Sequence, residues 1–184
     1  METFKVLIAD DETEIREILE NEVSSVFEGE NIEFFFAADG LEAVDLIKEH
    51  GPDLVLTDMK MPRMNGVDLI RYTRQIKKEP IIIMISAFGD RETLVNTMRL
   101  GAFDFFEKPF SEDQLKICLL RVKNFIQFKR TMFNQIKLFL QDENVREETI
   151  EQVFEFVNSI SKERYTSVGE SFIKGSIDFD LNLD

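Results

Sequence analysis

Cysteine and long apolar runs are nearly absent from this chain of 184 residues. Its single cysteine, Cys118, excludes an intramolecular disulfide and a zinc site built from cysteines, and the apolar sequence around it indicates ordinary core packing. No run of about 18 apolar residues is present, so we expect no membrane-spanning helix. The N-terminus lacks the pattern of a secretory signal peptide, which makes a cytoplasmic protein the default expectation.

Basic side chains are scarce relative to acidic ones. The chain has 22 Lys and Arg residues against 36 Asp and Glu residues, a net charge of −14. Nucleic-acid binding depends on Lys and Arg at the phosphates, so this balance argues against a nucleic-acid partner and favours cations or basic protein surfaces. Hydrophobic residues nevertheless make up 43% of the chain, enough for a core and evidence against global disorder.

The four prolines all fall at boundaries between segments. Between them, short apolar runs typical of buried strands alternate with amphipathic stretches typical of helices. This alternation predicts an α/β fold, with a mostly parallel sheet covered by helices on both faces. The first helix is expected to have Thr13 or Asp11 as its N-cap. The expected strands are 4–9, 32–37, 54–58, 81–85 and 102–107, and the helices between them begin near residues 13, 40, 66 and 90, with a fifth from 111.

Polar residues follow several of these strands where each one ends. In a parallel sheet the carboxyl ends share one edge, where open α/β proteins bind their ligands. Taken singly, each residue has an ordinary role as a helix cap, a turn residue or a surface charge. Together they predict one pocket, formed by Asp10, Asp11, Asp58, Ser86 and Lys108.

The residue types in this pocket indicate phosphoryl chemistry. Three carboxylates repel one another unless a cation joins them, and hard oxygen ligands favour Mg²⁺. A lysine and a hydroxyl suit the oxygens of a phosphoryl group. With Mg²⁺ beside it, Asp58 has the chemistry of a carboxylate nucleophile that forms an acyl phosphate.

Residues 4 to about 128 resemble the receiver domain of two-component response regulators. The resemblance rests on Asp10-Asp11, the run Asp58-Met59-Lys60-Met61-Pro62 with Gly66, Ser86-Ala87, and the segment 101–110. It implies a doubly wound, flavodoxin-like sheet of five parallel strands in the order 2-1-3-4-5. It also implies a cis peptide bond between Lys108 and Pro109.

The resemblance assigns a role to each residue of the pocket. Asp58 would be the phosphoacceptor and Lys108 would pair with the phosphoryl group. Asp11 would ligate Mg²⁺ directly, Asp10 mostly through water, and Lys60 through its backbone carbonyl, with Asp58 itself completing the protein ligands.

Ser86 and Phe105 would form the switch pair that responds to phosphorylation. Ser86 stands where threonine is commoner in the family, and Phe105 lacks the hydroxyl of a tyrosine. Phe88 either shields the acyl phosphate from water or packs as an ordinary surface residue.

Two further function classes compete with a signalling switch. A phosphatase with an aspartyl nucleophile would carry a second aspartate two residues later, where this chain has Lys60. A DNA-binding regulator is disfavoured by the charge. The protein is therefore expected to be no classical enzyme but a phosphoacceptor that assists its own phosphorylation and dephosphorylation. The one histidine, His50, lies in a turn and is expected to be solvated and far from the Asp58 edge, so the chain has no internal phosphohistidine donor. The donor would be a separate histidine kinase or phosphotransfer protein.

Residues 129–184 lie beyond the resemblance and are expected to form a helical extension to a receiver domain of residues 1–128. They carry a net charge of −4. No glycine or proline interrupts 111–140, which predicts one long helix of roughly 45 Å. A second helix over 145–160 would complete an αα-hairpin. The long helix either folds back on this second helix or forms a homodimer or another partner contact.

The last nine residues, 176–184, alternate strictly between polar and apolar. This is the periodicity of a strand, which would add to a sheet edge in the same or another chain. The alternative is a loose acidic tail.

Overall fold

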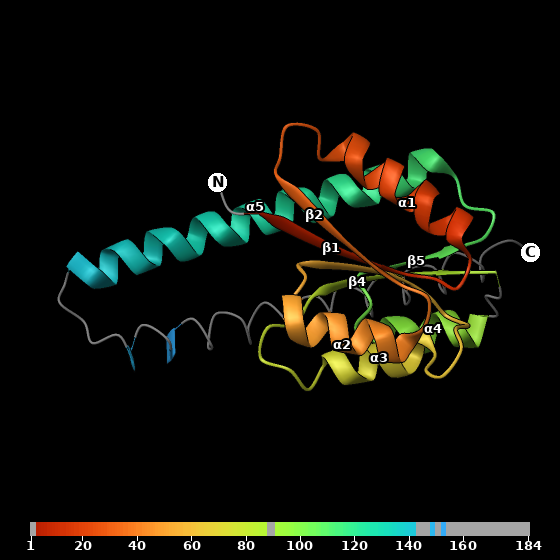
Figure 1. Ribbon diagram of the computed structural model, residues 1–184. Coiled ribbons are helices and arrows are strands. Elements are labelled where there is room, and N and C mark those ends of the chain that lie inside the picture. Colours follow the sequence, from red (N-terminus) through yellow and green to blue (C-terminus); the bar gives the residue numbers. More distant parts are fainter. Residues whose placement is uncertain (1–2, 88–90, 143–147, 150–151, 154–184) are drawn as a thin grey trace, which may run out of the picture. The chain divides into compact units, whose positions relative to one another are not determined.

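A parallel β-sheet lies between two layers of helices in the computed structural model, which describes residues 3–87, 91–142, 148–149 and 152–153 (Figure 1). The chain divides into two compact units, residues 1–120 and 121–184, and the sheet belongs to the first. In chain order the elements are β1 (Phe4–Ala9), α1 (Thr13–Val26), β2 (Ile32–Ala37), α2 (Gly40–His50), β3 (Leu54–Asp58), α3 (Gly66–Thr73), β4 (Ile81–Ser86), α4 (Arg91–Arg99), β5 (Asp104–Glu107) and α5 (Glu112–Asp142).

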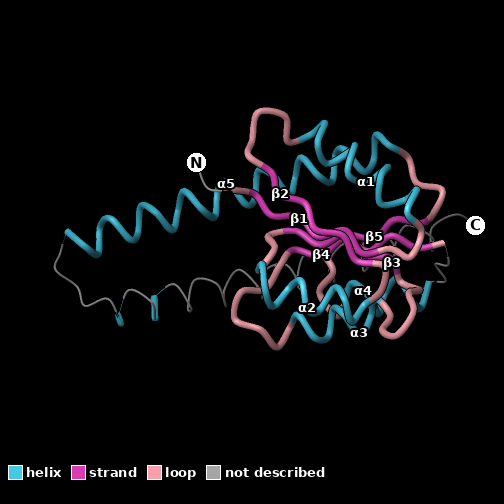
Figure 2. The backbone as a smooth tube through the Cα atoms, viewed as in Figure 1, coloured by secondary structure: helices cyan, strands magenta, loops and turns pink. Residues whose placement is uncertain are grey.

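The strand order is β2-β1-β3-β4-β5, and every neighbouring pair is parallel. This confirms the predicted five-stranded, doubly wound sheet. All five residues of the central strand β3 are buried, because helices cover both faces of the sheet. Figure 2 shows α1 and the start of α5 on one face, with α2, α3 and α4 on the other.

Local sequence signals set the ends of α2. The carboxylate of Asp39 accepts hydrogen bonds from the backbone amides of Leu41 and Glu42, which caps the N-terminus of the helix. At the other end Gly51 takes the left-handed conformation with φ +55° and donates its amide to the carbonyl of Ile47. Glycine suits this position because a side chain is strained there.

The predicted cap of α1 is wrong. Glu12 is the N-cap residue, and its side chain makes no capping hydrogen bond. At this N-terminal end of α1 the backbone amide of Glu12 donates to Oδ1 of Asp10 at 3.0 Å. Thr13 is instead the first residue of the helix, and its hydroxyl accepts a hydrogen bond from Nη2 of Arg16 at 2.9 Å.

The long helix predicted over 111–140 is confirmed as α5, one uninterrupted helix of 31 residues. Cys118 is buried and takes part in no disulfide, as expected. Residues 148–149 and 152–153 are helical, but the rest of the predicted helix 145–160 lies outside the described residues. The predicted strand 176–184 and Phe88 also lie outside them, and the domain boundary at residue 128 stays a prediction. Within the part of the chain that the structure describes, no helix is long and apolar enough to cross a membrane.

Candidate functional site

The sheet register brings four of the predicted site residues to one edge. Ala9 of β1 pairs with Thr57 of β3, so the residues that follow them, Asp10 and Asp58, are neighbours. Asp58 in turn pairs with Ile85 of β4, the residue before Ser86. Ser86 pairs with Glu107 of β5, which Lys108 follows. The predicted convergence of strand ends is therefore present.

Lys108 reaches from its own strand end into this cluster. Its Nζ lies 2.8 Å from Oδ2 of Asp10 and 3.4 Å from Oδ1 of Asp58. A third carboxylate, that of Glu12, lies 3.5 Å away at the exposed margin. The backbone amide of Lys108 donates to the carbonyl of Ser86 at 2.7 Å, which ties this residue to the end of β4. The peptide bond from Lys108 to Pro109 is cis, as the resemblance implied.

The loop after β3 folds around Asp58. Oδ2 of Asp58 accepts the backbone amide of Lys60 at 2.6 Å. Six residues after Lys60, the amide of Gly66 donates to the carbonyl of Met59 at 3.0 Å. A Cβ at Gly66 would collide with the backbone carbonyl of Asp58, so only glycine permits this close approach. The buried carboxylate of Asp58 is thereby held by the backbone of the loop that follows it.

Burial and the neighbouring charges have opposite effects on the pKa values of Asp58 and Lys108. Burial raises the pKa of Asp58, and the charge of Lys108 offsets only part of that effect. Burial alone would lower the pKa of Lys108. The hydrogen bond and charge of Asp10, together with the charge of Asp58, outweigh it and raise the pKa of Lys108. Lys108 therefore remains a cation between two carboxylates.

The oxygen atoms at this edge suit Mg²⁺. Asp10 and Asp58 are buried at the strand ends, while Asp11 is exposed beside them. Among the described residues, no three Asp, Glu, His or Cys side chains are grouped closely enough to enclose a metal. Mg²⁺ does not require such a cage, because it usually keeps several waters and takes one or two protein carboxylates. The donor set thus fits this ion by its hard oxygens and its negative charge.

The two predicted switch residues lie on neighbouring strands. Ser86 is buried at the end of β4. Phe105 of β5 pairs with Met84, two residues before Ser86. Its partly buried ring packs against the hydrophobic core. The structure places both residues beside the pocket, and their role in switching stays a prediction.

Two features near this edge were not predicted. The first is a hydrogen bond from Arg63, in the same loop as Lys60, to the carboxylate of Asp39. The second is the N-cap of α3, where the side chain of Asn65 accepts the amide of Asp68 at 2.9 Å. Asp39 followed by Glu42 three positions later is a helix-start signature that sequence reasoning had available. Nothing in the sequence pattern indicates the pairing with Arg63.

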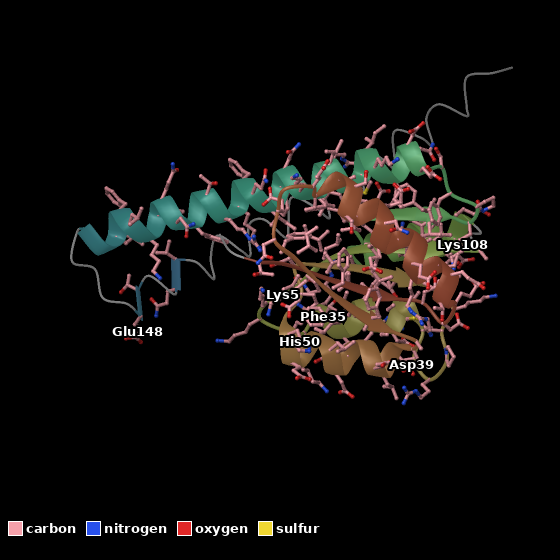
Figure 3. All side chains as sticks on the ribbon, turned by 45° about the horizontal axis from the view of Figure 1, so that its top comes forward. Lys5, Phe35, Asp39, His50, Lys108 and Glu148 are labelled. Atoms are coloured by element: carbon pink, nitrogen blue, oxygen red, sulfur yellow. The ribbon has the colours of Figure 1, made fainter. Side chains whose placement is uncertain are left out.

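His50 is not the solvated residue that was expected. Its ring stacks on Phe35 of β2 with the ring centroids 4.1 Å apart, and its side chain is 28% exposed. The carbonyl of His50 accepts Nζ of Lys5 at 3.2 Å. Within the unit that contains the sheet, Figure 3 shows His50 and Lys5 towards one side and Lys108 and Asp39 towards the other. The expectation that His50 lies far from the pocket is therefore confirmed.

Comparison with known proteins agrees with the fold. The family model of the response regulator receiver domain matches residues 6–119. The chain therefore belongs to the response regulator receiver family. Members of this class act in two-component signalling as phosphoacceptors, interact with histidine kinases or phosphotransfer proteins, and generally bind Mg²⁺ in an acidic pocket.

The relatives that are similar to this chain include one that the match covers almost in full and one that it covers by half. Sporulation initiation phosphotransferase F of Bacillus subtilis (strain 168) is 39% identical over 112 residues, which are 61% of this chain and 87% of that protein. The probable transcriptional regulator ycf27 of Galdieria sulphuraria is 37% identical over 133 residues, and the chain spans only 50% of its length. A solved receiver domain from Clostridium thermocellum superposes with a TM-score of 0.60 at 28% identity, over 68% of this chain and 98% of that one.

Proposed function

We propose that this protein accepts a phosphoryl group on Asp58 from a phosphohistidine on a separate kinase or phosphotransfer protein. The observation that carries the proposal is the position of Lys108, whose ammonium group lies between the carboxylates of Asp58 and Asp10. Asp58 is thus a buried carboxylate beside a fixed cation at the strand edge where open α/β proteins bind ligands. It is well placed to accept a charged group from outside.

The transfer needs few groups. A carboxylate oxygen of Asp58 forms a bond to phosphorus, the P–N bond of the phosphohistidine breaks, and the imidazole nitrogen takes up a proton. Lys108, whose Nζ lies 3.4 Å from Oδ1 of Asp58, would then pair with the oxygens of the new acyl phosphate. Bound Mg²⁺ would supply positive charge to the same oxygens. Asp10, Asp11 and the carbonyl of Lys60 would hold the ion, together with Asp58.

The response to phosphorylation is assigned to Ser86 and Phe105. In this proposal the hydroxyl of Ser86 turns to the phosphoryl group, and Phe105 turns further inward. The ring of Phe105 is partly buried and packs against the core, so an inward turn would bury it further. The surface altered by this change would serve to contact a protein.

The experiment is labelling with acetyl phosphate and Mg²⁺. Wild-type protein should form an acid-labile, hydroxylamine-sensitive acyl phosphate, and Asp58→Asn should form none. Asp45→Asn is the matched control, because Asp45 is an exposed aspartate on α2. Labelling of Asp58→Asn to the wild-type level would place the acceptor elsewhere and refute the proposal.

We further propose that the output is a protein contact of residues 129–184, formed as a homodimer through the C-terminal helices, and not DNA binding. Their net charge of −4 opposes contact with phosphates. Leu138 and Phe139 of α5 lie in this segment and are each about two-thirds exposed. Exposed apolar side chains on this scale commonly mark a binding surface.

Truncation after Phe128 tests this second proposal. The shortened protein should still be labelled on Asp58 but should lose self-association, as measured by sedimentation or light scattering with and without Mg²⁺ and a fluoride phosphate mimic. Unchanged self-association of the truncated protein would show that the extension is not the interface.

A further inference from the structure

The loop that carries Lys60 contains one residue in an unusual backbone conformation. Arg63 has a φ of +62°, and it is the only described residue other than glycine with a positive φ. Side chains with a Cβ are disfavoured in this left-handed region. An interaction must therefore stabilise this backbone conformation of Arg63, and the contacts of its side chain identify that interaction.

Arg63 is bound to Asp39, which precedes α2 in a different part of the chain. Nε of Arg63 donates to Oδ2 of Asp39 at 2.7 Å, and Nη2 donates to the same oxygen. The other oxygen, Oδ1, accepts the amides of Leu41 and Glu42 at 2.9 and 3.0 Å. One carboxylate thus caps α2 and holds the loop at the same time.

Close packing beside this pair limits the position of the loop. A Cβ on Gly40 would collide with both the backbone carbonyl and the Cβ of Met64. The backbone after Arg63 therefore lies directly against the first residue of α2. On its other side the same loop meets Asp58 through the contact at Gly66. The segment between Asp58 and Gly66 is held at both ends.

We propose that Asp39 and Arg63 are positioning residues for the phosphoacceptor loop. By fixing the loop against α2, they hold the backbone of Lys60, whose amide donates to Asp58 and whose carbonyl is assigned to Mg²⁺. The pair touches neither the metal nor the phosphoryl group. It acts through the loop, so its loss should weaken Mg²⁺ binding. This inference rests on the proposed roles of Asp58 and Lys60.

The alternative is an ordinary surface ion pair with no effect on the pocket, since Arg63 is 58% exposed. The chain offers a matched control for it. Arg71 is 60% exposed and pairs with Asp68 at 3.0 Å on α3. Arg63→Ala and Arg71→Ala therefore change the net charge equally and each removes one arginine from an ion pair with aspartate.

The measurement is the Mg²⁺ concentration that half-saturates the folded, intact chain at a fixed temperature, obtained by isothermal titration calorimetry with Mg²⁺ as the only added ligand. We expect Arg63→Ala to raise this concentration about tenfold, as the loss of groups that support metal ligands typically does. Arg71→Ala should leave it unchanged. Acetyl phosphate labelling of Arg63→Ala should be slow at limiting Mg²⁺ and recover at saturating Mg²⁺.

Arg63→Gly separates the ion pair from the backbone conformation. Glycine adopts the left-handed region without strain, so this variant keeps the loop geometry available but removes the contact with Asp39. We expect it to bind Mg²⁺ as weakly as Arg63→Ala. Wild-type Mg²⁺ affinity in Arg63→Gly would show that the backbone alone positions the loop, and the proposal would be overturned.

Asp39→Asn completes the test from the other partner. The amide oxygen can still accept from Leu41 and Glu42, so the cap of α2 is retained while the charge facing Arg63 is lost. The double variant Asp39→Asn/Arg63→Ala should bind Mg²⁺ no more weakly than the weaker single variant, because both act through one contact. If the losses of Mg²⁺ affinity in the two single variants added up in the double variant, Asp39 and Arg63 would act independently, against the proposal. If the wild type itself were not labelled at Asp58, the proposed function would fail first, whatever these variants do.

Discussion

Nζ of Lys108 lies 2.8 Å from Oδ2 of Asp10, although the two residues are 98 positions apart in the sequence. The side chain of Asp10 is 1% exposed and that of Lys108 is 12% exposed. The pair joins the end of β1 to the end of β5 across the edge of β3, where Asp58 lies. Its charges are taken out of water, so each depends on the other for compensation.

Lys108→Met should destabilise the protein by about 3 kcal/mol in the absence of Mg²⁺, because it leaves two buried carboxylates without their cation. Added Mg²⁺ should restore part of this loss by supplying the missing charge. Urea denaturation with and without Mg²⁺ measures both effects. Lys48→Met, which removes an exposed lysine beside Asp45, is the control and should change stability by less than about 0.5 kcal/mol. Equal effects of the two substitutions would contradict the structural role of Lys108.

Asp11→Ala should keep or raise the stability of the metal-free protein. Asp11 is an exposed carboxylate next to two buried ones, so its removal relieves repulsion. The same substitution should abolish the increase in Tm that Mg²⁺ gives to the wild type, because a ligand stabilises only the state that binds it. Thermal denaturation across a Mg²⁺ series is the measurement. The same increase in Tm in both proteins would exclude Asp11 as a metal ligand.

Asp39→Asn should lower stability in a manner that depends on pH. The hydrogen bond from Arg63 holds the pKa of Asp39 below its ordinary value of 3.8. A lowered pKa means that the ionised carboxylate stabilises the folded state fully above pH 3.8, and that this stabilisation is lost as the pH falls through the pKa of the folded state. The difference in unfolding free energy between wild type and variant should therefore be constant near neutrality and shrink in acid. A difference that does not vary with pH would show that the charge of Asp39 is irrelevant.

Gly66→Ala should destabilise the protein by about 1–3 kcal/mol, as overpacking typically does. The added methyl group would meet the backbone carbonyl of Asp58, which belongs to the central strand and has little freedom to move. The strain falls on the phosphoacceptor itself, so acetyl phosphate labelling should slow as well. Chemical denaturation and labelling rates test the two parts. Wild-type values for both would show that the loop can shift without consequence.

The sequence by itself determined the sheet and most of the pocket. Strands and helices were readable because apolar periodicity is a local property of the chain, visible within a few residues. The pocket followed from one topological rule, that parallel strands end at the same edge, which was enough to associate Asp58 with Asp10, Ser86 and Lys108. The individual roles of these residues came from the family resemblance.

Only the tertiary structure decided which side chains meet across separate segments. Asp39 could be recognised as a helix cap, but its second oxygen is bound by Arg63, 24 positions later. His50 stacks on Phe35 because the end of α2 lies over β2. Such pairs depend on distances between segments that are set by the packing of whole elements. Sequence periodicity records which face of an element is buried, but it carries no information about the side chain that lies opposite.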